Sequence, residues 1–84
     1  MVVFTADWLG EGTIMDAIVD QLSEDYKDRF GFFRIDVEQS KGISHQLGIR
    51  RLPTIFFFRQ GEMVGQFMGM KAKYLLKEKI DSLL

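Results

Sequence analysis

The sequence predicts an α/β domain in which three helices lie on the two faces of a four-stranded mixed sheet. Short runs of β-branched and aromatic residues alternate with segments whose apolar residues repeat at a helical period. A helical segment joins the first two runs, which favours a parallel pair with a right-handed crossover. Gln60-Gly61 separates the last two runs and is a two-residue hairpin signal. The expected element order is β-α-β-α-β-β-α.

Length and composition limit the class of protein. We expect a single domain over residues 1–84, near the smallest size that one hydrophobic core stabilises. The chain is 46% hydrophobic with a formal charge of -1 and has no basic tract, which argues against nucleic acid or a membrane as partner. No apolar run is long enough to cross a bilayer and no targeting signal is visible, so we expect a soluble domain of unknown localisation.

The first strand is predicted over Met1–Ala6, an apolar run rich in β-branched residues that suits the centre of a sheet. A helix should follow the glycine-bearing stretch 7–12. Thr13 and Asp16 have the spacing of a capping box at its start. Its expected apolar stripe consists of Ile14, Met15, Ile18, Val19, Leu22 and Tyr26.

The second strand is predicted over Gly31–Val37 and should end at a polar turn. In that turn we interpret Asp36 and Glu38 as solvated carboxylates rather than a catalytic pair. A short helix should then run to Leu47, with Gly48 as its C-terminal cap.

The third strand, Thr54–Phe58, is a run of β-branched and aromatic residues after Pro53. It should pair antiparallel with Glu62–Met68 through the hairpin. The last helix is predicted to be amphipathic, with lysines on its outer side. Its apolar residues are Ala72, Leu75, Leu76, Ile80 and Leu83.

Four features at matching positions make the sequence similar to the thioredoxin superfamily over nearly its whole length. Residues 4–12 (FTADWLGEG) resemble the segment that carries the family's Trp-Cys-Gly-Pro-Cys motif. Residues 48–54 (GIRRLPT) resemble the segment around its cis-proline, and residues 58–62 (FRQGE) resemble its Phe-Lys-x-Gly-Glu hairpin. Gly69 stands where the family has a glycine before the last helix. The resemblance implies a thioredoxin-like fold.

The departures from the family pattern bear on activity. Leu9 and Gly12 stand where the resemblance places the two redox cysteines, and Val3 stands at the position of the family's buried aspartate. The chain contains no cysteine, so it has no thiolate nucleophile, no disulfide and no thiolate metal site. We therefore expect no dithiol–disulfide exchange, no enzyme activity of this class and no cofactor. His45 has no partner residues at metal-ligand spacing, so we expect no metal site.

A second departure is that family members usually carry one more strand and helix before the first segment seen here. Without that strand, Phe32–Val37 would form an exposed sheet edge with unpaired backbone groups. A homodimer through this edge is one expectation.

The resemblance also implies a groove that binds protein or extended peptide. In the family, the residue before the cis-proline offers its backbone to a bound strand, and Leu52 stands there in this sequence. The binding residues implied in this way are Trp8, Leu9, Gly10, Leu52, Pro53 and Gly69.

Alternatives remain open at several positions. Trp8 could border the groove or pack over the start of the helix, and Leu9 could anchor a partner or face the core. Arg50 and Arg51 could flank the groove or be exposed loop charges. A redox protein whose cysteines lie elsewhere in a longer native chain, or were replaced, is the alternative function, and a purely structural or oligomerising domain is another.

Overall fold

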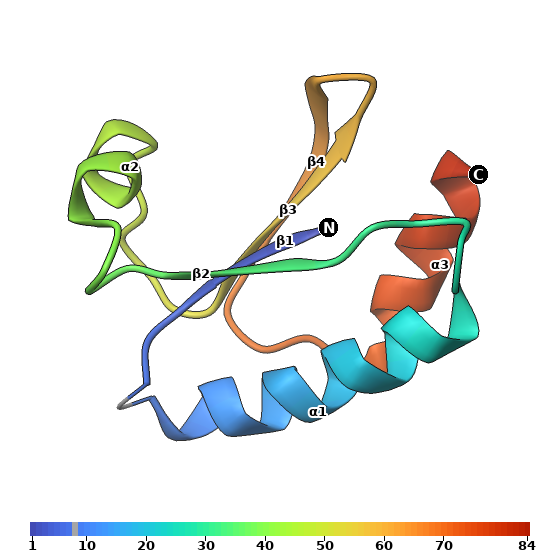
Figure 1. Cartoon of the computed structure of the whole chain (residues 1–84), viewed down its shortest axis with the longest axis horizontal. Coiled ribbons are helices and arrows are strands. Elements are labelled where there is room, and N and C mark those ends of the chain that lie inside the picture. The colour runs from blue at the N-terminus through green and yellow to red at the C-terminus, as the bar shows by residue number, and fades with distance from the viewer. Residues whose placement is uncertain (8) are drawn as a thin grey trace.

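The computed structural model describes residues 1–7 and 9–84, with positions 11 and 12 described as backbone only. These residues form four strands and three helices in the predicted order, as Figure 1 shows. The elements are β1 (Val2–Thr5), α1 (Gly10–Asp25), β2 (Phe33–Asp36), α2 (Lys41–Gln46), β3 (Thr54–Arg59), β4 (Glu62–Met68) and α3 (Lys73–Leu83). None of the described helices is both long and apolar enough to cross a membrane.

The described strands form one mixed sheet in the order β2-β1-β3-β4. β1 is parallel to β2 and antiparallel to β3, and β3 is antiparallel to β4. The predicted central position of the first strand is confirmed. Gln60 and Gly61 connect β3 to β4 with φ values of 53° and 83°, the positive values that a two-residue turn between twisted strands requires.

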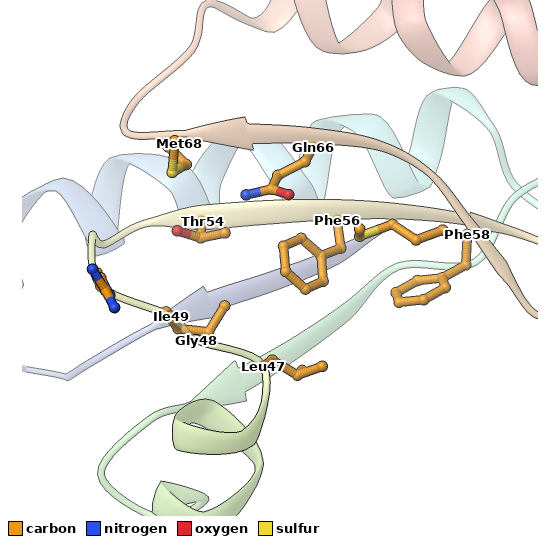
Figure 2. Close-up of a pocket in the computed structure, with 10 residues that line it drawn as sticks. Leu47, Gly48, Ile49, Thr54, Phe56, Phe58, Gln66 and Met68 are labelled. Carbon is orange, nitrogen blue, oxygen red and sulfur yellow. The ribbon is translucent and has the colours of Figure 1, made fainter.

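The hydrophobic core lies between one face of the sheet and the two long helices. Val3, Ile55 and Phe57 point from the sheet into this layer. α1 and α3 cover it from the outside and meet near the C-terminal end of α1, as Figure 1 shows. Their fully buried side chains are Met15, Leu22, Leu76 and Ile80. α2 lies on the other face of the sheet, where Leu47 at its C-terminal end lines a pocket together with Phe56 (Figure 2).

The start of α1 corrects the capping-box prediction. The helix begins at Gly10, and Leu9 occupies the N-cap position, where no side-chain hydrogen bond caps the described helix end. Thr13 therefore lies inside the helix. Ile14 is 56% exposed whereas Met15 is fully buried, so Ile14 was wrongly assigned to the core stripe. Neighbouring residues on a helix point about 100° apart, and in this pair Met15 points into the core while Ile14 points out of it.

The end of α2 confirms the prediction for Gly48. This residue has φ 69°, a backbone conformation that glycine adopts without a steric penalty. Its N–H donates to the carbonyl of His45 at 3.1 Å, and the N–H of Ile49 donates to that of Ser44 at 3.0 Å. These two bonds form the Schellman motif, which turns the chain sharply from α2 toward β3.

The turn before α2 corrects the interpretation of Asp36. Its side chain is buried rather than solvated, and its Oδ1 accepts hydrogen bonds from the backbone N–H groups of Glu38 at 2.7 Å and Gln39 at 3.3 Å. Burial by itself would raise the pKa of this carboxyl, but the backbone hydrogen bonds outweigh it and the pKa is lowered. Asp36 thus holds the turn between β2 and α2.

Candidate functional site

The register of the sheet brings three separate segments to one end of it. Phe4 of β1 pairs with Thr54 of β3, and Thr54 pairs with Met68 of β4. β1 and β4 finish at this end and β3 begins there. The turn into α1, the loop before β3 and the segment after β4 therefore leave the sheet together.

The loop before β3 contains the predicted binding residues Leu52 and Pro53. The peptide bond between them is cis. Pro53 is buried and Leu52 is half-buried. The hydroxyl of buried Thr54 donates to the carbonyl of Arg51, which closes the loop on the side of β3.

Gly69 connects the end of β4 to this loop. Its N–H donates to the carbonyl oxygen of Pro53 at 2.7 Å, and its φ is 83°. A Cβ at this position would lie 3.1 Å from Nε and Nη2 of Arg51. The Arg51 side chain therefore lies against Gly69 at the candidate groove, whereas Arg50 lines a pocket on the other face of the sheet. The sequence alone had not distinguished whether Arg50 and Arg51 flank the groove or are exposed loop charges.

The start of α1 supplies the remaining predicted binding residues. Leu9 is half-buried and its N–H donates to the carbonyl of Ala6 at 3.0 Å, which forms the turn into the helix. Gly10 is exposed, and a Cβ there would meet nothing within 4 Å. Trp8 lies outside the residues that the structure describes, and Gly12 is placed only as backbone within α1.

The position that the resemblance assigns to the family's buried aspartate holds Val3. Val3 is 1% exposed and belongs to the hydrophobic core, so that position holds an apolar side chain among apolar neighbours. Among the side chains of residues 1–7, 9–10 and 13–84, no group of three His, Cys, Asp or Glu could hold a metal ion. His45 is exposed on α2.

A charged cluster beside the site was missed by sequence reasoning. Arg34 of β2 donates to Asp7 at 2.9 Å and to Asp16 of α1 at 3.2 Å. The hydrogen bond with Asp7 is the main reason that the pKa of Arg34 is raised. This cluster connects the turn after β1 to the neighbouring strand and helix. The one signal for this cluster in the sequence was the alternation of side chains along β2. It places Arg34 on the same face of the sheet as its partner residue Val3.

Comparisons with known proteins agree with this fold. The family model described as Thioredoxin matches residues 1–82. A chloroplastic M-type thioredoxin of Spinacia oleracea is 30% identical over 84 residues, which cover 100% of this chain and 46% of the relative. The thioredoxin of Mycoplasmoides gallisepticum is 37% identical over 78 residues, covering 93% of this chain and 77% of the relative. This chain thus spans less than half the length of the spinach relative.

Two solved structures resemble the fold. A mutant thioredoxin from Halobacterium salinarum NRC-1 superposes with a TM-score of 0.89 at 29% identity, over 98% of this chain and 71% of the other. A malarial protein superposes with a TM-score of 0.91 over 99% of this chain and 93% of the other. At 20% identity, that second likeness concerns the fold alone.

Proposed function

Since this chain belongs to the thioredoxin family and contains no cysteine, we propose that it is a redox-inactive module that binds extended peptides beside Leu52 and Pro53. Dithiol–disulfide exchange needs a thiolate, which no side chain of this sequence supplies. What remains of the family's site is its backbone geometry.

The observation that carries the proposal is the meeting of three segments at one end of the sheet. Leu9 and Gly10, the Leu52–Pro53 loop and Gly69 leave the sheet together, and the hydrogen bond from Gly69 to Pro53 ties two of them. Leu9 stands where the family resemblance places a redox cysteine, so an apolar side chain takes the place of a reactive one. Apolar side chains and free backbone groups suit the binding of a peptide rather than the catalysis of a reaction.

In the proposed complex, the backbone N–H and C=O of Leu52 pair with an extended peptide. Such strand addition draws affinity from main-chain hydrogen bonds and specificity from the side chains around them. Leu9 and Met70 are half-buried and offer apolar walls, and methionine adapts its shape to different partners. Affinity should be weak, because a short peptide buries little area and loses conformational freedom on binding.

Amide-resonance mapping with a short extended apolar peptide tests the proposal. We expect the largest shifts at Leu9, Leu52 and Gly69. The same peptide with N-methylated amides cannot pair its backbone and should not shift them. Shifts confined to residues 32–37, or equal shifts with the N-methylated peptide, would contradict strand addition at Leu52.

A second candidate function is homodimerisation through the edge strand. β2 is the first strand in the described sheet order, with β1 as its one neighbour there, and Phe33 is 64% exposed. An open edge with an exposed aromatic side chain favours pairing with another strand. The mass of the protein in solution, measured over a range of concentrations with Phe33→Lys as the comparison variant, tests this candidate.

A further inference from the structure

The guanidinium of Arg51 lies face-on against Gly69. The site that a Cβ on Gly69 would occupy is 3.1 Å from Nε, 3.1 Å from Nη2 and 3.2 Å from Cζ of Arg51. An approach within the guanidinium plane would leave Cζ clearly farther away than the two nitrogens, so these nearly equal distances place that site over the flat face. The N–H groups lie in the plane and therefore do not point at Gly69.

The glycine makes this close contact possible. Gly69 is buried, and its N–H donates to the carbonyl oxygen of Pro53 at 2.7 Å, which fixes the end of β4 against the loop before β3. A side chain at this position would displace the guanidinium. Arg51 itself is exposed. The positive charge is thus held beside the loop that contains Leu52 while it remains open to solvent.

The carboxylates described at this end of the sheet have other partners. Asp7 accepts a hydrogen bond from Arg34 at 2.9 Å. The buried side chain of Asp36 accepts two backbone N–H groups of its own turn. None of the ion pairs between described side chains includes Arg51. Within the described part of the chain, the guanidinium therefore keeps its capacity to donate to a ligand.

The neighbouring cations indicate which anionic group fits. Lys71 lies over an aromatic ring of β4, and Lys73 pairs with Asp25 at 3.1 Å. Arg50 lines a pocket on the other face of the sheet. A single arginine is thus left at the groove among the described cations, whereas phosphorylated segments are generally bound by arginine clusters. The planar fork of one guanidinium matches one carboxylate.

We propose that Arg51 makes the groove select peptides that carry a glutamate or aspartate next to the residue that pairs with Leu52. This inference rests on the proposed peptide groove. In a pair of strands, the residue opposite Arg51 is the neighbour of the residue opposite Leu52, and opposite residues share a face. Two N–H groups of the guanidinium then donate to the two oxygens of the peptide carboxylate.

The test compares two short apolar peptides that differ at one position, which is glutamate in one and glutamine in the other. Titrations of the wild-type protein are followed through the amide resonances of Leu52 and Gly69. The glutamate peptide should bind about three- to five-fold more tightly, as expected for a largely exposed ion pair. When the glutamate is moved along the peptide, the preference should peak at one position, because neighbouring side chains of an extended chain point to opposite sides.

Two neutral variants separate the neighbouring arginines. Arg51→Gln should lower the affinity for the glutamate peptide to that for the glutamine peptide. The hydrogen bond from the Thr54 hydroxyl uses the backbone carbonyl of Arg51, so this substitution leaves it in place, and circular dichroism verifies the fold. Arg50→Gln is the matched control, because Arg50 lies on the other face of the sheet and its loss should leave the preference for glutamate unchanged.

Charge reversal distinguishes selection from a merely structural role. Arg51→Glu should bind a peptide with lysine at the selected position more tightly than the glutamate peptide. A side chain that only packs against Gly69 would not reverse the preference in this way. Raising the ionic strength should weaken the preference of the wild type and that of Arg51→Glu, because both depend on exposed charges.

The outcomes separate this inference from the proposed function. Equal affinities for the glutamate and glutamine peptides, with shifts at Leu52 and Gly69, would overturn selection by Arg51 and leave the peptide groove in place. A preference for glutamate that persists in Arg51→Gln would also overturn it. If none of the peptides binds, the groove itself is contradicted, and selection by Arg51 with it.

Discussion

The N–H of Gly69 donates a 2.7 Å hydrogen bond to the carbonyl oxygen of Pro53, and the guanidinium of Arg51 lies directly against Gly69. The end of β4 and the loop before β3 are therefore one structural unit. The side chain of Arg51, from the loop before β3, occupies the space next to Gly69 that a Cβ at this position would need. This unit forms one wall of the candidate peptide groove.

Gly69→Ala should lower the free energy of unfolding by about 1–3 kcal/mol, because an alanine at φ 83° is strained and its Cβ would crowd Arg51. Gly61→Ala is the matched control: its φ is also 83°, but nothing lies within 4 Å of its Cβ. Urea denaturation should show the larger loss at Gly69. Adding Arg51→Ala should recover part of that loss, and equal losses at both glycines would show that the contact with Arg51 is unimportant.

Tyr26 should make stability depend on alkaline pH. Its hydroxyl is buried and donates to Oδ1 of Asp81 at 2.6 Å, and burial and this hydrogen bond raise its pKa to about 12. The unfolded value is about 10, so the folded state favours the protonated phenol. The resulting stability is complete below about pH 10 and is lost as the pH rises toward 12.

Denaturant midpoints measured across this pH range check the prediction for Tyr26. The decrease of the denaturant midpoint with rising pH should be smaller in Tyr26→Phe, because this variant has no phenol to ionise at position 26. In a Tyr74→Phe background, phenolate absorbance reports Tyr26 alone and should rise only near pH 12. Ionisation of Tyr26 near pH 10 in the folded protein would contradict the role of burial and of Asp81.

Installing Leu9→Cys with Gly12→Cys should create a pair that can form a disulfide but exchanges slowly. Val3 is buried among apolar side chains and cannot accept a proton from the pair. Insulin reduction should be absent in the wild type and slower in the double variant than in a complete thioredoxin. A rate equal to that of the complete enzyme would show that the buried acid is dispensable in this domain.

The sequence predicted the elements that depend on local signals. The apolar run of β1, the Gln60-Gly61 hairpin and the Gly48 cap each follow from residues adjacent in the chain. The N-cap of α1 was predicted four residues too late, because Leu9 carries no capping signal whereas Thr13 offers a misleading one. The pattern of apolar residues also placed both Ile14 and Met15 in the core stripe, although only Met15 is buried.

The candidate surfaces could be predicted only in part. The residues of the Leu52 loop came from the family resemblance, but the contact of Arg51 with Gly69 depends on how β4 meets that loop. The pocket beside α2 was not predicted at all. The sequence shows that Phe56 and Phe58 are apolar. Whether the side of the sheet that carries them is covered depends on where the helices pack, which the sequence does not give.

Peptide binding followed through the fluorescence of Trp8, the single tryptophan of the chain, tests the central claim most directly. An extended apolar peptide should change this fluorescence and saturate with weak affinity, and its N-methylated form should produce no change. Leu9→Asp should weaken binding by placing a charge on the apolar wall, while Phe58→Asp on the other face should have no effect. Saturable binding that is indifferent to N-methylation and to Leu9→Asp would contradict a peptide groove at Leu52.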